Sequence, residues 1–126
     1  MTPAAYVYNV LANNLESLPQ IEIENVYTFY VDDNASPAKP LILITETVGM
    51  GDAYGNNEVL YNYKRVQLDI YYPRDYIQDM NTLEQALKQV LRANGIYCYS
   101  DAGHVITLDS KNITNTLKFN LKMEVL

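Results

Sequence analysis

Apolar and polar residues alternate most clearly in the stretch Tyr63–Tyr72, which predicts a β-strand with one buried and one wet face. The residues expected to be buried are Val66, Leu68, Ile70 and Tyr72. The run Leu41–Thr47 is apolar on both faces, through Leu43 on one side and Ile42 and Ile44 on the other. It is therefore predicted to be an interior strand of the same sheet.

A helix is predicted for Ala4–Leu18, because apolar residues recur near one face. Thr2 and Pro3 suit the N-cap and the first helical position, and Pro19 ends the element. The β-rich stretch Glu24–Val31 predicts another strand, followed by a turn-rich loop.

The second helix has the clearest amphipathic pattern in the chain. Asn81 and Glu84 have the spacing of a capping box, and Asn94-Gly95 is a typical helix stop. The apolar stripe consists of Leu83, Ala86, Leu87, Val90 and Leu91. Glu84 and Lys88, four residues apart, are predicted to form an ion pair.

The last third of the chain predicts three strands. Ile96–Ser100 and His104–Leu108 form an expected hairpin around Asp101-Ala102-Gly103, and Asn115–Val125 alternates strictly to its end. The resulting class is α+β: one domain over residues 1–126, with a mostly antiparallel, mixed sheet of about five to six strands and both helices on one face.

Between Thr47 and Asn62 the periodicity is lost, and the segment contains glycines and acids but no Lys or Arg. We interpret it as a long hairpin arm, mobile in isolation, because structureless loops of this length are usually functional or disordered. It is either a connector or an arm that orders against a neighbouring subunit. The candidate residues are Gly49, Asp52, Tyr54, Gly55, Asn56, Glu58 and Tyr61.

Composition narrows the classes of function. Fifteen acids against nine bases give a formal charge of −6, which disfavours tight binding to nucleic acid. A single cysteine excludes an internal disulfide, and neither a signal peptide nor a membrane-spanning run is expected. The twelve tyrosines suit either protein interfaces or the rim of the core. The candidate interface tyrosines are Tyr27, Tyr30, Tyr71, Tyr97 and Tyr99.

No set of residues predicts catalysis, cofactor binding or metal binding. The glycines of Gly49–Gly55 match neither a dinucleotide fingerprint nor a P-loop. Cys98 and His104 are interpreted as a small core residue and a solvated turn residue rather than a nucleophilic pair, and they provide no zinc-like cluster.

A family resemblance extends over most of the chain. It rests on Leu43–Glu46, Asp52–Asn56, Val66–Tyr72, Leu83–Leu87 with Asn94-Gly95, His104, Thr107–Asp109 and the strand around Thr116. In their order and spacing these stretches resemble the small tail-component proteins of long, non-contractile-tailed phages (siphophages) of Gram-positive bacteria, a family similar to tail terminators.

The resemblance implies a structural virion protein of the tail and neck, assembled in the host cytoplasm. Such a protein forms a ring of identical subunits, expected to be a hexamer, that caps the tail tube, stops its polymerisation and presents a surface to the head-tail connector. Phage DNA would pass through the ring without specific binding, and no cofactor, catalytic residue or membrane is implied. Asp52 and Glu58 would then face the channel or the neighbouring subunit.

Three other interpretations stay open at this point. A head-completion or head-tail connector protein shares the small α+β fold and the ring geometry. A stand-alone binding module would use the tyrosines to hold a peptide or glycan. An enzyme ranks last, because no nucleophile, base or metal set converges.

Overall fold

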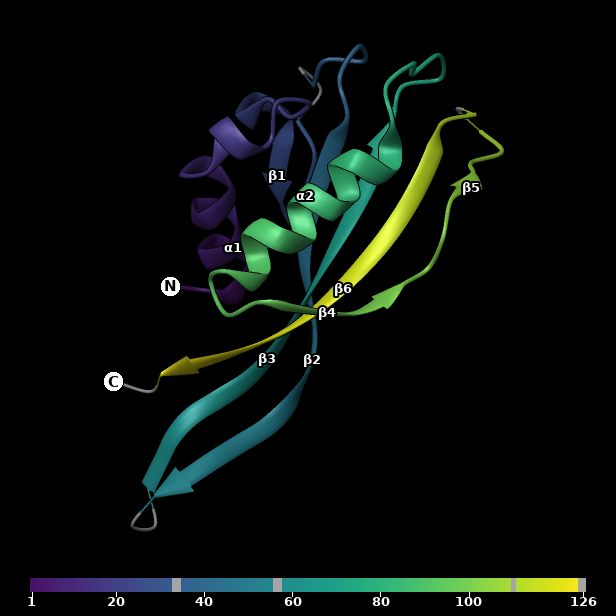
Figure 1. Ribbon diagram of the computed structural model, residues 1–126. Helices are drawn as coiled ribbons and strands as arrows, with labels where there is room; N and C mark the ends of the chain where they lie inside the picture. The colour runs from purple at the N-terminus through teal and green to yellow at the C-terminus, as the bar shows by residue number, and fades with distance from the viewer. Residues whose placement is uncertain (33–34, 56–57, 110, 125–126) are drawn as a thin grey trace.

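The computed structural model describes residues 1–32, 35–55, 58–109 and 111–124, with the backbone alone over 48–62 and at 124. Its elements, shown in Figure 1, are α1 (Pro3–Ala12), η1 (Leu15–Ser17), η2 (Ile23–Asn25), β1 (Val26–Thr28), β2 (Leu41–Gly55), β3 (Glu58–Tyr72), α2 (Met80–Arg92), β4 (Tyr97–Asp101), β5 (Val105–Ile106) and β6 (Ile113–Glu124).

The strands form one open, mixed sheet of six strands in the order β1-β2-β3-β6-β4, with β5 also paired to β6. β1 lies parallel to β2, and the other pairs are antiparallel. Both α-helices lie on the same side of this sheet (Figure 1). The predicted α+β class, the mostly antiparallel sheet and the placement of both helices are therefore confirmed.

The core lies between the helices and one face of the sheet. Every second residue of the central strands is buried there, as the alternation predicts. The strand residues of this face are Ile42, Ile44, Val66, Leu68, Ile70, Tyr72, Leu117, Phe119 and Leu121. They pack against Val7 and Leu11 of α1 and Leu83, Leu87 and Leu91 of α2 in one buried cluster.

Helix α1 is shorter than predicted, because it ends at Ala12 rather than Leu18. The Asn14 side chain donates to the Val10 carbonyl at 2.7 Å, and the chain continues as the short 3-10 turn η1. Asparagine side chains compete in this way with the backbone bonds that extend a helix. Leu18 is nevertheless fully buried, so its apolar position was correctly interpreted as core.

Helix α2 begins earlier than predicted, and the proposed capping box is wrong. The N-cap is Asp79, whose carboxylate accepts from the Asn81 backbone N–H at 2.9 Å. The predicted stop is confirmed: Gly95 has φ +80°, and the Ile96 N–H donates to the Leu91 carbonyl at 3.0 Å. This is the Schellman arrangement, in which glycine tolerates the left-handed backbone.

The first strand is much shorter than the predicted Glu24–Val31. Residues Ile23–Asn25 form a 3-10 turn, and pairing of β1 with β2 ends at Thr28. Phe29 then has φ 68°, which turns the chain out of the ladder. A bulky residue rarely adopts this left-handed conformation, so the sequence pattern gave no sign of it.

The predicted hairpin between Ile96 and Leu108 is also wrong. β4 and β5 both pair with β6, at successive places along its length, rather than with each other. The link between them is held against β6, where the Ala102 N–H donates to the Thr116 carbonyl at 3.0 Å. The long last strand is close to its prediction, while Val125 lies outside the described residues.

Strands β2 and β3 both run into the segment that was predicted to be a long hairpin arm. β2 continues past Thr47 to Gly55, and β3 begins at Glu58 rather than Tyr63. Their pairing extends to Gly55 opposite Glu58, with register shifts between Thr47 and Gly51 and between Ala53 and Tyr54. In Figure 1 this two-stranded arm extends beyond both helices, at the end of the molecule opposite the loops that precede β2 and α2.

Candidate functional site

The face of the sheet opposite the helices has no covering layer among the described residues. It carries polar, charged and tyrosine side chains from β3, β6 and β4, with a few apolar ones from β2. As the strand registers and the contact between Arg65 and Tyr99 place them, the open face includes Leu41, Leu43, Thr45, Tyr63, Arg65, Gln67, Asp69, Tyr71, Tyr97, Tyr99, Thr114, Thr116, Lys118, Asn120 and Lys122.

An aromatic and cationic group lies in the β3–β6–β4 part of the open face. The Arg65 guanidinium lies 4.8 Å from the centroid of the Tyr99 ring and donates from Nε to Asn120 Oδ1 at 3.2 Å. Tyr97 and Tyr99 expose 53% and 42% of their surface. Large exposed aromatic rings beside an arginine are the residue types that dominate binding energy at protein interfaces.

The remaining candidate tyrosines are spread over the β1 and β2 side. Tyr27 pairs with Leu43 and is half-buried, and Tyr71 pairs with Leu41 and is half-buried too. Burial and the nearby Asp69 carboxylate raise the pKa of the Tyr71 phenol, so it stays neutral at physiological pH. Tyr30 follows β1 and is 75% exposed.

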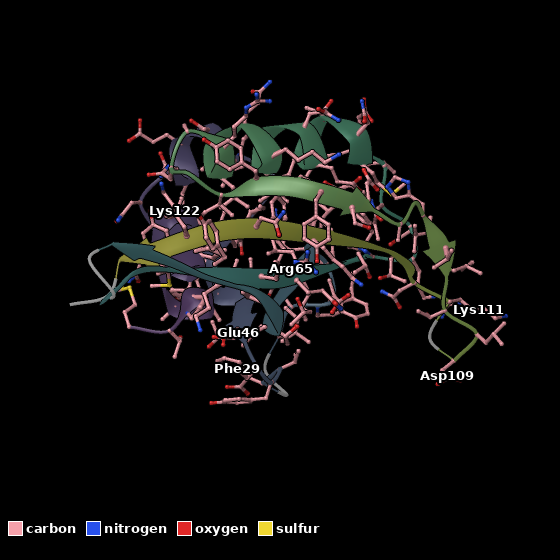
Figure 2. All side chains as sticks on the ribbon, turned by 90° about the horizontal axis from the view of Figure 1, so that it is seen from below. Phe29, Glu46, Arg65, Asp109, Lys111 and Lys122 are labelled. Carbon is pink, nitrogen blue, oxygen red and sulfur yellow. The ribbon has the colours of Figure 1, made fainter. Side chains whose placement is uncertain are left out.

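Phe29, Tyr30 and Val31 form an exposed apolar segment directly after β1. Phe29 exposes 54% of its surface although its backbone adopts the left-handed conformation. In Figure 2 its side chain projects from the body on the side away from α2. Backbone strain that is kept at an exposed aromatic residue favours a role in contact with another molecule.

The predicted arm residues lie on the two strands of the arm. Gly49, Asp52, Tyr54 and Gly55 belong to β2, Glu58 and Tyr61 belong to β3, and Asn56 lies outside the described residues. The backbone pairs Asp52 with Asn62 and Ala53 with Tyr61. The arm is thus a β-ribbon in line with the central strands.

Two strand edges lack a partner within the described part of the chain. β1 pairs with β2 only as far as Ile44, so the outer edge of β2 is unpaired from Thr45 onward. β4 pairs with β6 only as far as Asn120, so the outer edge of β6 is unpaired beyond it. Unpaired edges are templates for pairing with another chain.

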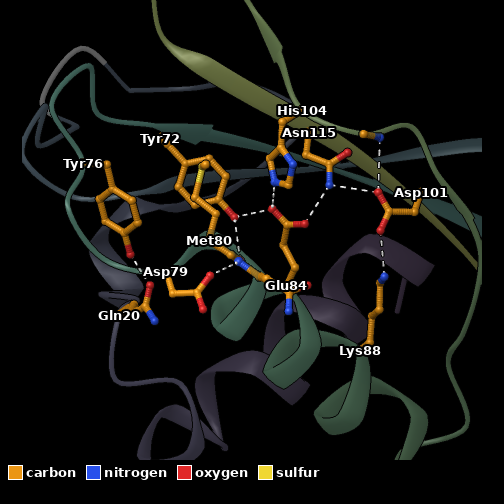
Figure 3. A network of polar contacts seen from close by, with 12 residues as sticks. Gln20, Tyr72, Tyr76, Asp79, Met80, Glu84, Lys88, Asp101, His104 and Asn115 are labelled. Carbon is orange, nitrogen blue, oxygen red and sulfur yellow. Dashed lines mark hydrogen bonds and ion pairs between the residues drawn. The ribbon is translucent and has the colours of Figure 1, made fainter.

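The helix side holds a buried polar network centred on Glu84 (Figure 3), which the sequence analysis missed. The Glu84 side chain is 3% exposed and accepts from Tyr72 Oη at 2.5 Å and from Asn115 Nδ2 at 2.8 Å. His104 Nε2 lies 2.6 Å from the same carboxylate. Because Glu84 lies three and seven residues before Leu87 and Leu91, its place on the buried stripe could have been read from the spacing.

The predicted ion pair between Glu84 and Lys88 does not form, and each of the two side chains has another partner. Lys88 Nζ pairs with Asp101 Oδ2 at 2.7 Å, and Glu84 turns inward to His104. The hydrogen bond that Lys88 donates to Asp101 lowers the pKa of the Asp101 carboxyl group and raises the pKa of the Lys88 amine. These contacts attach the link between β4 and β5 to α2, so the interpretation of His104 as a merely solvated residue is wrong.

The network has a structural role, because it joins α2 to β3, to β6 and to the link between β4 and β5. Burial, followed by the hydrogen bond to Glu84, raises the pKa of Tyr72 far above its usual value, so the phenol remains a neutral donor.

Cys98 is half-buried against the core and donates to the Ser100 carbonyl at 3.4 Å. Among the described residues, no group of three or more His, Cys, Asp or Glu could hold a metal ion.

A hollow with a volume of about 610 Å³ lies between α2 and β4. It is lined by Gln85, Lys88, Gln89, Arg92, Tyr97 and Cys98. A hollow of about 250 Å³ lies where β4 stops covering β6, beside Tyr63, Tyr97 and Lys122. No helix in the described residues is long and apolar enough to cross a membrane.

These features define a class: a small α+β protein with one helix-covered and one open sheet face, and a β-ribbon arm. The chain belongs to the family described as "Protein of unknown function (DUF806)", whose model matches residues 2–124. No curated protein matches it. It is similar to a chain of the solved structure described as "Virion of native gene transfer agent (GTA) particle", with a TM-score of 0.60 and 12% identity over 99% of this chain and 100% of that chain. At this identity the likeness concerns the fold.

Proposed function

We propose that this protein is a structural component of a phage-like virion, and specifically a tail terminator, or tail completion protein. In this role it forms a ring, most simply a hexamer, that caps the tail tube, stops its polymerisation and receives the head-tail connector at the neck. It is assembled in the host cytoplasm, and its role involves no chemical step.

The observation that carries the proposal is that helices cover one face of the sheet, while the other face has no covering layer among the described residues. Exposed tyrosines lie on the open face, and the outer edges of β2 and β6 are unpaired. A head-to-tail interface joins two different surfaces of one subunit and closes into a ring when the rotation per subunit permits. The full-length fold similarity to a chain from a gene transfer agent virion adds support.

The acidic character of the chain suits a ring through which DNA passes. With a formal charge of −6, the subunit repels phosphates at close range, where salt screens incompletely. DNA then slides through the lumen without specific binding. The arm residues Asp52 and Glu58 contribute to this acidity, either in the channel or against a neighbour.

Deletion of the gene in the parent phage or particle tests this function. Loss of a terminator leaves tail tubes that grow beyond their normal length, and expression of the natural chain restores the length. Tails of normal length that fail to join to full heads would instead identify a head-completion or connector protein, the second candidate with the same ring geometry. Normal particles would contradict both.

A further inference from the structure

Strands β2 and β6 lie on either side of β3, and both continue toward the tip of the arm after their outer neighbours have ended. β2 pairs with β1 only as far as Ile44 but continues to Gly55, with β3 on its inner side. β6 pairs with β4 only as far as Asn120 but continues to Glu124, again with β3 on its inner side. Among the described residues, no strand covers the outer edge of either continuation.

The outer edge of β6 has room for another strand. A hollow of about 250 Å³ lies on its open-face side, beside Tyr63 and Tyr97, and one of about 400 Å³ lies on its helix side, beside Met123. Gly95, before β4, and Leu121 of β6 line both hollows. β4 and β5 already occupy successive places on this edge. Because successive side chains of a strand point to opposite faces, a strand added at the next place would fill both hollows.

The outward-facing backbone groups of β2 follow from the ladder. The Thr116 carbonyl accepts from the Ala102 N–H, so this residue of β6 directs its backbone groups away from β3. These groups alternate in direction along a strand, and the unbroken register of β6 with β3 carries the alternation across to β2. Gly51 and Ala53 then face β3, while Asp52 directs its N–H and C=O to the outer edge.

We infer that the outer edge of β2 in one subunit pairs with the outer edge of β6 in the next copy of this chain, so that the sheet continues between subunits. This inference rests on the proposed function, because it specifies the contact that closes the ring. One repeated contact covers both edges only if β2 joins β6, and such a head-to-tail contact can close into a ring. Since β2 and β6 are both antiparallel to β3, the two strands would pair in parallel around an axis that follows them.

Engineered disulfides test this contact directly. In a Cys98→Ser background, Met123→Cys on β6 is combined in turn with Gly51→Cys, Asp52→Cys or Ala53→Cys on β2. Within one chain β3 separates these strands by about 10 Å, which is too far for a disulfide. After mild oxidation with diamide in the presence of tail tube protein, we expect at least one pair to give a ladder of covalent oligomers up to the full ring.

The single-cysteine variants and a displaced pair are the controls. Met123→Cys alone and Ala53→Cys alone are expected to stay monomeric on a denaturing gel. The same result is expected for Ala53→Cys with Gln85→Cys, because Gln85 is exposed on α2. Covalent dimers from either single variant would identify a two-fold contact, β6 with β6 or β2 with β2, and would overturn the inference.

A proline variant tests the backbone of β2 independently of its side chains. Asp52→Pro removes the outward N–H, and Asp52→Ala is the matched control, because it removes the same side chain and keeps the N–H. We expect the proline to raise the ring-forming concentration at least about tenfold and the alanine to leave it close to that of the natural chain. Native mass spectrometry and electron microscopy measure ring formation, and circular dichroism establishes that both variants are folded.

Two further results would overturn the inference: no cross-link from any of the three pairs although rings form, or equal ring formation in the proline and alanine variants. In either case the natural chain still forms rings, and the proposed function stands. If the natural chain forms no ring even with tube protein, the proposed function fails and this contact fails with it.

Discussion

The two faces of the sheet are built from the same strands but differ in what covers them. On the helix side, Val66, Leu68 and Ile70 of β3 are fully buried. On the open side, the residues that alternate with them, Arg65 and Gln67 among them, are only half-buried. The first face is complete within one chain, whereas the second keeps aromatic and cationic side chains at its surface.

The difference indicates that this chain divides its roles by face. Apolar burial on the helix side supplies the stability of the subunit, since buried area is the main favourable term in folding. The open side contributes little to that stability and is free to serve contact with other molecules. Substitutions on the two faces should therefore separate folding from assembly.

The largest expected effect is in the core. Phe119→Ala removes a fully buried ring and should lower the free energy of unfolding by about 3 to 5 kcal/mol. Asn120→Ala, the next residue and on the open face, removes only the acceptor of the Arg65 hydrogen bond and should cost about 1 kcal/mol. Denaturant unfolding of both variants measures the contrast, and equal losses would refute the division between the faces.

The next effect concerns the buried network on the helix side. Glu84→Ala takes the acceptor from Tyr72 and Asn115 and the partner from His104, and should cost about 3 kcal/mol. Gln85→Ala, at the exposed neighbouring position, is the control and should be nearly neutral. Similar midpoints of urea unfolding for the two variants would show that the polar network around Glu84 adds nothing to stability.

The pair of Lys88 and Asp101 should make a smaller, pH-dependent contribution. Because folding lowers the pKa of its carboxyl group, Asp101 stabilises the fold at pH values above its unfolded pKa of 3.8. This contribution is lost as the pH falls through the folded pKa. Because folding raises the pKa of its amine, Lys88 stabilises the fold at pH values below its unfolded pKa of 10.5. This contribution is lost as the pH rises through the folded pKa.

Lys88→Met should therefore lower the free energy of unfolding by less than about 1 kcal/mol between these limits, since the Asp101 side chain is 39% exposed. The difference from the natural chain should shrink at both extremes of pH. Lys39→Met, in the looser pair with Glu22 at 3.8 Å, is the control and should have a smaller effect. A difference that does not vary with pH would contradict the assignment.

The smallest effect on stability is expected at Phe29. Phe29→Gly relieves the left-handed backbone and should raise the free energy of unfolding by up to about 1 kcal/mol. The loss of the exposed ring should at the same time weaken assembly, which sedimentation of the mixture with tube protein detects. A clear loss of stability would mean that the ring packs within the subunit.

The elements with a strong period were predictable from the sequence, and those defined by single side chains were not. The alternation in β3 and β6 and the stripe of α2 gave the sheet, its buried face and the helix that covers it. The end of α1 depends on one Asn14 side-chain bond, and the end of β1 depends on the conformation of Phe29. Neither leaves a periodic signal.

The candidate site was predictable in kind but not in arrangement. The segment between Thr47 and Asn62 was predicted to be a hairpin arm from its glycines and acids, but the extension of β2 and β3 along it was not assigned because the segment has no apolar alternation. The tyrosines were selected by type, whereas their grouping with Arg65 follows from the register of β3, β6 and β4. Glu84 was assigned to a capping box and to an ion pair with Lys88, and its burial was missed.

Hydroxyl-radical footprinting of the tyrosines, on the isolated chain and on the chain assembled with tube protein, tests most directly whether a partner completes the open face. We expect Tyr97 and Tyr99 to become protected on assembly, while Tyr6 and Tyr8 of α1 keep their reactivity. Protection confined to the α1 tyrosines, or unchanged reactivity of Tyr97 and Tyr99 in the assembled state, would contradict the account.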